Sequence, residues 1–176
     1  MIRNTLKELW SQGKPAINGW LSVGNPFIAE IMAAQGYDTL SIDQQHGFLG
    51  YDALAPMLQA MKGSPVTPIV RVPWLSAGDI MKALDAGAMG IICPMINTRE
   101  DAQKLVAWTH YAPMGTRSFG PIRASIYGGA DYAEYFEVAD PGYMLSHMPG
   151  VTVSMIDGKV QPAKPGDAII GVTRPK

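Results

Sequence analysis

The chain has 176 residues, of which 47% are hydrophobic and 16% are charged, and its formal net charge is -1. This length allows one good hydrophobic core, or one domain with a small appendage. The composition is typical of a globular protein and excludes a disordered chain. The net charge gives no electrostatic basis for binding nucleic acid or an anionic membrane.

The single cysteine, Cys93, excludes an intrachain disulfide and a zinc site built from thiolates. Residues 1–10 read as an amphipathic helix and lack the continuous apolar run of a signal peptide. No apolar run approaches the length of a membrane span. We therefore expect a cytoplasmic protein with no nucleic-acid partner and no membrane partner.

Up to about residue 110, strand signals alternate with helix signals. The expected strands cover residues 16–23, 38–43, 67–71 and 89–94, the last of them apolar on both faces, as in a buried parallel strand. Helix starts are indicated by Asn25 before Pro26, by Ser76 with Asp79, and by Thr98. A further helix is expected over residues 51–62.

Strands that alternate with helices in this way are parallel. The sequence therefore predicts an α/β fold with four βα units, which is either half of an eight-stranded barrel or a small open sheet. No Gly-x-Gly-x-x-Gly motif follows any strand, so a dinucleotide-binding fold has no support.

The pattern changes after residue 111. Residues 112–123 form a loop rich in glycine and proline, and residues 131–137 suggest a short helix. Strand signals at residues 151–156 and 159–160 flank Asp157-Gly158, a strong hairpin turn, and residues 168–172 suggest another strand. We expect a βα domain over residues 1–132 and a β-rich tail over residues 133–176.

Chemistry-bearing residues follow two of the expected strands. Asp43 and His46 come directly after one strand, before Gly47, and Arg71 ends the next. Ligands bind at the carboxyl ends of parallel strands. Histidine moves protons near neutral pH, and a guanidinium forks onto a carboxylate. The alternative is structural: turn and cap residues for the first pair, and an ordinary ion pair for the arginine.

Five motifs in order resemble those of the HpcH/HpaI aldolase family over about residues 1–132. They are Ser41-Ile-Asp-Gln-Gln-His-Gly47, Ile69-Val-Arg-Val-Pro-Trp74, Leu84-Asp-Ala-Gly87, Cys93-Pro-Met95 and Pro113-Met-Gly-Thr-Arg-Ser-Phe-Gly-Pro121. These enzymes are metal-dependent pyruvate aldolases on a (β/α)8 barrel. The resemblance implies an incomplete TIM barrel of about four βα units, followed by the β-rich tail.

The resemblance also implies roles for five residues. His46 is then the catalytic base, Asp43 orients it, and Asp85 raises its basicity. Arg71 binds the carboxylate of the oxo-acid and stabilises the enolate, and Arg117 adds to the binding of the substrate. Without the family, Asp85 reads as structural and Arg117 as a solvated loop residue.

A divalent metal, Mg or Mn, is expected from the family, which holds it with a glutamate after the fifth strand and an aspartate after the sixth. Neither segment exists in this sequence, so no metal ligand is identified. Asp131, Glu134 and Glu137 share one helical face, for which we expect a solvated surface.

The tail weakly resembles the peptidase G2 domain of phage tail-spike proteins over about 45 residues from Ala130. Ser146 and His147 match no cleavage motif, so we expect no protease role. A fusion of two unrelated segments is one explanation of this pairing.

The resemblance to the HpcH/HpaI aldolases implies a carbon–carbon lyase that reversibly cleaves a 4-hydroxy-2-oxo acid into pyruvate and an aldehyde. We expect little or no activity, because the metal ligands are missing, and we expect a homo-oligomer, because half a barrel leaves open strand edges. The alternatives are a phage-type structural module fused to an aldolase fragment and a non-catalytic oxo-acid binder.

Overall fold

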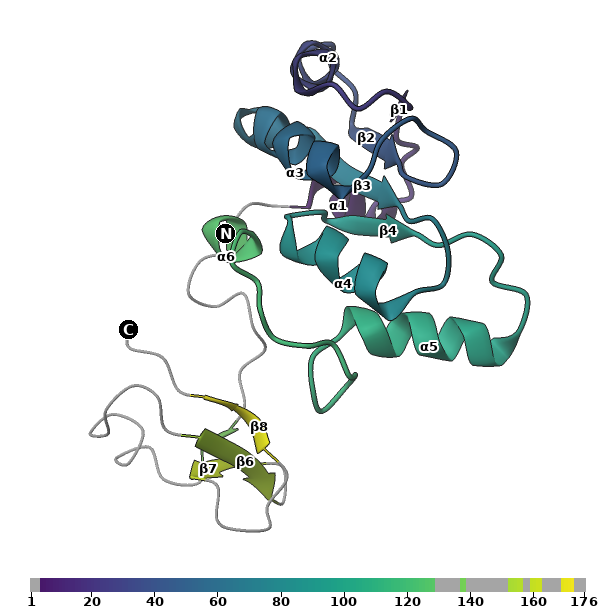
Figure 1. Ribbon diagram of the computed structural model, residues 1–176. Helices are drawn as coiled ribbons and strands as arrows, with labels where there is room; N and C mark the ends of the chain where they lie inside the picture. Colours follow the sequence, from purple (N-terminus) through teal and green to yellow (C-terminus); the bar gives the residue numbers. More distant parts are fainter. Residues whose placement is uncertain (1–3, 129–136, 139–151, 157–158, 163–168, 173–176) are drawn as a thin grey trace.

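The computed structural model describes residues 4–128, 137–138, 152–156, 159–162 and 169–172. Strands and helices alternate through the first part of the chain (Figure 1). The strands are β1 (Asn18–Leu21), β2 (Thr39–Asp43), β3 (Thr67–Arg71) and β4 (Gly90–Ile92). The helices are α1 (Thr5–Ser11), α2 (Pro26–Ala33), α3 (Tyr51–Ala60), α4 (Ala77–Asp85), α5 (Arg99–Thr109) and α6 (Ala124–Gly128), with a 3-10 turn η1 (Met61–Gly63) after α3. The order of elements predicted up to about residue 110 is confirmed, whereas α6 was not predicted.

The predicted helix starts are also confirmed. The side chain of Asn25 accepts hydrogen bonds from the first backbone N–H groups of α2, and Pro26 is the first residue of that helix. The Ser76 hydroxyl accepts from the N–H of Asp79, and Thr98 and Asp101 form a reciprocal capping box. Local side chains therefore decide where these helices begin, because they satisfy backbone N–H groups that the helix itself leaves open.

The four strands form one parallel sheet in the order β1-β2-β3-β4. Each strand thus pairs with the next one along the chain, as in a (β/α)8 barrel, whereas a doubly wound sheet reverses its order at a switch point. The register places Asp43 opposite Arg71, so the last residues of β2 and β3 are neighbours. This pairing puts the two predicted site residues at the same edge of the sheet.

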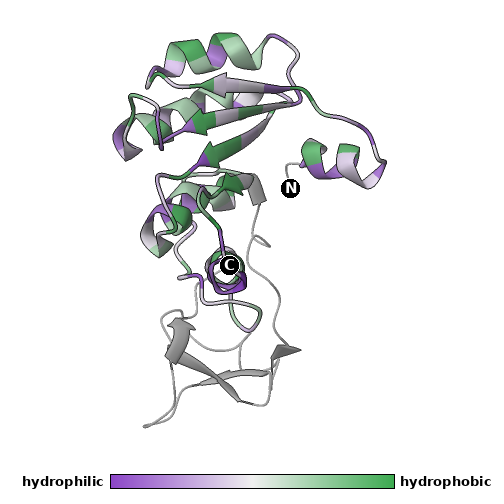
Figure 2. Cartoon of the chain, turned by 90° about the vertical axis from the view of Figure 1, so that its right-hand side faces the viewer, coloured by the Kyte–Doolittle hydropathy of each residue, from purple (hydrophilic) through white to green (hydrophobic). Residues whose placement is uncertain are grey.

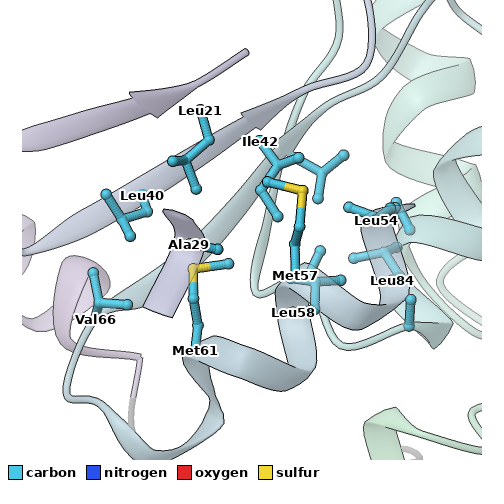
Figure 3. Packing of buried hydrophobic residues seen from close by; sticks show 14 of the residues in the cluster. Leu21, Ala29, Leu40, Ile42, Leu54, Met57, Leu58, Met61, Val66 and Leu84 are labelled. Carbon is cyan, nitrogen blue, oxygen red and sulfur yellow. The ribbon is translucent and has the colours of Figure 1, made fainter. Parts of the chain in front are cut away.

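The two faces of the sheet differ in chemistry. One face carries Leu21, Ile42 and Val70, which are at most 3% exposed and belong to the main core. Met57 and Met61 point toward this layer from α3 and η1 (Figure 3). Flexible methionine side chains fill the space left by the branched residues of the strands. The core therefore lies between the sheet and the following helices.

The opposite face is polar. Its members alternate with the core residues along the strands: Asn18, Trp20, Thr39, Ser41, Asp43, Thr67, Ile69 and Arg71. The hydroxyls of Thr5 in α1 and Thr67 lie 2.8 Å apart, and the Ser41 hydroxyl donates to the Asn18 side chain. In Figure 2, α1 lies beside the N mark, away from the other helices. The amino-terminal helix thus pairs with polar groups that would otherwise be buried without hydrogen bonds.

One expectation about burial was wrong. β4 is half-buried along its length instead of fully buried, because it pairs only with β3 among the described strands. In α2 the buried residues are Ala29 and Ala33, and the larger Phe27 and Ile31 are 67% and 46% exposed. The small residues of α2 thus belong to the core, and the larger ones on its other faces remain on the surface.

Four more strands are described beyond α6: β5 (Glu137–Val138), β6 (Thr152–Ile156), β7 (Lys159–Pro162) and β8 (Ile169–Val172). β6 pairs antiparallel with β7 and with β8. The Asp157-Gly158 turn, the start of the expected helix at 131–137 and the expected domain boundary at 132 lie outside the described residues. Glu137, the last residue of that expected helix, lies in a strand instead.

Among the described helices, none is long and apolar enough to cross a membrane.

Ile42 and Ile31 give a matched test of this core. Ile42 is fully buried and Ile31 is 46% exposed. We expect Ile42→Ala to lower the free energy of unfolding by about 3 kcal/mol, because it leaves a cavity in the core. Ile31→Ala is expected to change it by less than about 1 kcal/mol. Urea unfolding followed by circular dichroism measures both, and equal losses would contradict this assignment of the core.

Candidate functional site

The Asp43 carboxylate is the centre of the polar groups at the carboxyl edge of the sheet. Its two oxygens accept hydrogen bonds from Arg71 Nε at 2.8 Å and Arg71 Nη2 at 2.6 Å. The backbone N–H groups of Gln45 and His46 also donate to it, at 3.0 and 3.2 Å. Asp43 is 2% exposed. A buried carboxylate with this many donors is a fixed anchor whose oxygens already have partners.

The pKa of Asp43 lies well below its usual range. The main cause is the charge-assisted hydrogen bond from Arg71, and the backbone N–H of His46 and the indole of Trp20 act in the same direction. Burial opposes this shift but is outweighed. The same ion pair raises the pKa of Arg71. Both side chains are therefore charged throughout the physiological range.

Arg71 presents only part of its guanidinium to Asp43. The side edge, Nε and Nη2, is occupied by the carboxylate. The end edge, formed by Nη1 and Nη2, is the second place where a guanidinium can take a carboxylate with two hydrogen bonds. The side chain is 23% exposed. The arginine is thus held by one acid while a second bidentate edge stays available for another.

Trp20, on β1, completes this cluster and was not predicted from the sequence. Its indole Nε1 donates to Asp43 Oδ2 at 3.2 Å, and the Arg71 Cζ atom lies 4.8 Å from the centre of its ring. The parallel register places Trp20 opposite Ser41 on the face that carries Asp43. The alternation of residues along β1 does not predict this contact, because it does not show which face of the strand meets the site.

His46 lies in the loop that follows Asp43. Its backbone N–H is bound to the Asp43 carboxylate, and its side chain is exposed. Within the described part of the chain, the imidazole makes no hydrogen bond. Gly47 is required next to it, because a Cβ there would collide with the carbonyl oxygen of Asp43. The predicted contact of Asp43 with His46 therefore runs through the main chain, and the imidazole faces solvent.

Asp85 and Arg117 form a separate ion pair, with 2.6 Å between Asp85 Oδ1 and Arg117 Nη2. Arg117 is also stacked on Tyr111, with Cζ 4.6 Å from the ring centre. Asp85 ends α4 and precedes β4, so it belongs to the amino side of the sheet, whereas Asp43 and Arg71 end their strands. The structure thus divides the predicted site residues into two groups, Asp43, Arg71 and His46 in one and Asp85 and Arg117 in the other.

The described residues do not fit a divalent metal centre. They contain no group of three or more His, Cys, Asp or Glu side chains arranged to hold a metal ion. Asp43, the one acid at the carboxyl edge that the sequence singled out, already accepts from Arg71, Trp20 and two backbone N–H groups. A metal would compete with these donors for the same lone pairs.

The ion pair predicts how stability depends on pH. In the folded state the pKa of Asp43 is depressed below the value of about 4 expected for an unfolded chain. The ion pair therefore stabilises the fold fully above that value, and its contribution is lost as the pH falls below it. We expect Asp43→Asn to lower the free energy of unfolding by about 2 kcal/mol at pH 7. Its deficit relative to wild type should shrink at pH 3, as measured by urea unfolding.

Asp52→Asn is the control for this experiment, because Asp52 is exposed in the first turn of α3. It should behave as wild type at both pH values. A deficit of Asp43→Asn that is the same at pH 7 and pH 3 would contradict the role of the charged pair.

Comparisons with known proteins agree with the βα architecture of this chain. The family model described as HpcH/HpaI aldolase/citrate lyase matches residues 17–155, and so extends past the expected boundary at 132. A protein from Rhizorhabdus wittichii named hydroxypyruvate/pyruvate aldolase is 45% identical over 129 residues, which are 73% of this chain and 51% of that protein. A 4-hydroxy-2-oxovalerate aldolase from Novosphingobium aromaticivorans is 39% identical over 127 residues, 72% of this chain and 48% of that protein.

A crystal structure of an HpcH/HpaI aldolase/citrate lyase family protein from Burkholderia cenocepacia matches with a TM-score of 0.67 and 35% sequence identity. That match covers 74% of this chain and 54% of the other. The chain therefore spans about half the length of the relatives it matches. The matched segment includes β1 to β4 and the Asp43–Arg71 cluster, and on this basis the chain belongs to the HpcH/HpaI aldolase/citrate lyase family.

Proposed function

We propose that this chain carries the oxo-acid-binding part of an HpcH/HpaI-type aldolase. The reaction is the reversible cleavage of a 4-hydroxy-2-oxo acid into pyruvate, or a relative of pyruvate, and an aldehyde. Membership of the family supports this proposal, as do the names of the two relatives, a hydroxypyruvate/pyruvate aldolase and a 4-hydroxy-2-oxovalerate aldolase.

The observation that carries the proposal is the orientation of Arg71. Asp43 takes the side edge of the guanidinium with bonds of 2.8 and 2.6 Å, which leaves the end edge for a ligand carboxylate. A positive charge fixed in this way needs no rearrangement when negative charge develops on the substrate. Arg71 therefore binds the carboxylate of the oxo-acid and stabilises the enolate that forms beside it.

His46 is the proposed base. Its imidazole is exposed on the loop that Asp43 holds through the backbone N–H of His46. In the cleavage direction it takes the proton from the 4-hydroxyl group, and the bond between C3 and C4 breaks as the aldehyde carbonyl forms. The electron pair of that bond becomes the enolate of pyruvate, and a proton returned to C3 completes the reaction. Asp43 acts by holding both Arg71 and this loop.

The predicted roles of Asp85 and Arg117 remain predictions. Asp85 is expected to raise the basicity of His46, and Arg117 to assist substrate binding. α4 has nine residues, a length of about 13 Å, and separates Asp85 from the carboxyl edge of the sheet. The pair has a clear structural effect within the chain, because it ties the loop after α5 to the end of α4.

We propose that turnover by this chain is weak or absent. Enzymes of this family are generally dependent on a divalent metal, which acts as a Lewis acid for the developing enolate. The described residues offer no three-ligand cluster for it. A non-catalytic oxo-acid binder is therefore the second candidate function, favoured by an arginine site beside which the described residues form no metal-ligand cluster.

We also propose that the four βα units are about the first half of a (β/α)8 barrel and that residues 133–176 form a separate β-rich domain. β1 and β4 each pair with one described strand only, and a homo-oligomer would cover such edges.

The antiparallel strands β6, β7 and β8 are compatible with a tail of the phage peptidase G2 type and hence with a structural module. Ligand binding separates these alternatives, because a purely structural module binds no oxo-acid.

Binding of oxalate or pyruvate tests Arg71. We expect calorimetry and thermal shift to detect oxalate binding by the wild-type chain. We expect Arg71→Lys to weaken it by about tenfold or more, because an ammonium group cannot form the bidentate pair. Arg99→Lys, on the exposed start of α5, is the matched control and should bind as wild type.

The titrations are run with and without magnesium or manganese. Binding that requires a metal would mean that the chain assembles a metal centre, and the aldolase proposal would become stronger. Binding without a metal favours the non-catalytic binder. No binding under either condition would overturn the proposal and direct attention to the β-rich strands.

Exchange of the pyruvate methyl protons in deuterium oxide tests His46 without an aldehyde partner. We expect slow exchange at most for the wild-type chain with manganese. Any exchange above the buffer rate should fall by about 100-fold or to background in His46→Gln, because the base is lost. Oxalate affinity should be unchanged in this variant. Exchange that is equally fast in both proteins would exclude His46 as the base.

A further inference from the structure

Trp20 contacts both members of the Asp43–Arg71 pair from a different strand. The indole N–H donates to Asp43 Oδ2 at 3.2 Å, and the Arg71 Cζ atom lies over the indole ring, 4.8 Å from its centre. Trp20 is 42% exposed, so it is not held there by deep burial in the core. An exposed tryptophan with two specific polar contacts is better explained by the site than by packing.

The two contacts of Arg71 fix different degrees of freedom. The fork to Asp43 fixes the side edge of the planar guanidinium, with Nε at 2.8 Å and Nη2 at 2.6 Å from the carboxylate oxygens. It does not prevent that plane from tilting about the axis of the fork, because hydrogen bonds to carboxylate oxygens tolerate a broad range of angles. The Trp20 ring, which lies 4.8 Å from Arg71 Cζ, opposes this tilt. Together the carboxylate and the indole determine where the end edge of Arg71 points.

The indole also holds Asp43. Oδ2 accepts from Arg71 Nη2 and from Trp20 Nε1, and Oδ1 accepts from Arg71 Nε and from the backbone of the His46 loop. Each carboxylate oxygen therefore has donors from two directions, and rotation of the carboxyl group would break at least one bond on each side. The side chain of Trp20 thus links β1 to Asp43 at the end of β2 and to Arg71 at the end of β3.

We propose that Trp20 is a positioning residue of the oxo-acid site, which orients the free end edge of Arg71 toward a ligand carboxylate. This inference rests on the proposed function for its ligand. The end edge of Arg71 takes the carboxylate of the ligand in the plane of the guanidinium, because its N–H groups lie in that plane.

The test compares Trp20→Phe and Trp20→Leu with wild type. Phenylalanine keeps a ring for the guanidinium face and loses the N–H donor, whereas leucine loses both. We expect oxalate affinity to fall by about threefold in Trp20→Phe and by about tenfold in Trp20→Leu, as measured by calorimetry. Trp10→Leu is the matched control, since Trp10 is 62% exposed on α1, and it should bind as wild type.

A second measurement does not depend on the ligand. In the nuclear magnetic resonance spectrum, Arg71 Nε–H is expected to be protected from exchange and shifted by the ring current of Trp20. Trp20→Leu should remove the ring-current shift and speed the exchange, and Trp20→Phe should retain part of the shift. A merely structural role would lower thermal stability and remove the ring-current shift, but it would leave the exchange rate of Arg71 Nε–H unchanged.

The outcomes are distinct. If wild type binds oxalate and Trp20→Leu binds equally well, the positioning role is overturned while the proposed function stands. If wild type binds no oxalate, the proposed function fails, and the exchange of Arg71 Nε–H alone decides whether Trp20 holds the guanidinium. An unchanged exchange rate in Trp20→Leu would overturn the inference in either case. If Trp20→Leu does not fold, Trp20→Phe supplies both measurements.

Discussion

The ion pair between Asp43 and Arg71 connects elements that are far apart in the sequence. The two residues are 28 positions apart and end neighbouring strands, and the same carboxylate holds Trp20 of β1 and the backbone of the His46 loop. Three strands and a loop thus share one buried charge. Such a charge is costly to bury without partners, so the arrangement around it is strongly constrained. The geometry of the candidate site is a consequence of satisfying Asp43.

This pair depends in turn on a sheet with two unlike faces. The face that carries Leu21, Ile42 and Val70 supplies the apolar core with the helices that follow each strand. The other face carries threonine, serine, aspartate and arginine, and α1 supplies hydrogen-bonding partners to Thr67 at its amino side. Polar residues are tolerated on this face because they bind one another, and they give the carboxyl edge its chemistry. The fold is stabilised on one face, and the candidate site lies at the edge of the other.

The two ion pairs described above have different positions and therefore different effects. Asp43 and Arg71 meet at the carboxyl edge, where a guanidinium with an available edge favours an anionic ligand. Asp85 and Arg117 join the end of α4 to the loop after α5, with Arg117 itself 8% exposed. Asp85 and Arg117 are thus separated from Asp43 and Arg71 along the length of α4. The placement supports ligand binding by the first pair and loop anchoring by the second.

The sequence by itself determined the order of elements, the caps of α2, α4 and α5, the parallel sheet and the family. These follow from local hydrogen bonds at Asn25, Ser76 and Thr98 and from the spacing of strands and helices, which are properties of short stretches. The pairing of Asp43 with Arg71 could also be predicted from the sequence, since both residues end adjacent strands. The contribution of Trp20 was not, because it depends on the register of β1 against β2 and on which face of β1 meets the site. Tertiary structure also decided that Asp85 pairs with Arg117 and that β4 is half-buried. Both facts depend on which surfaces of the fold meet, and a local sequence pattern contains no information about such contacts.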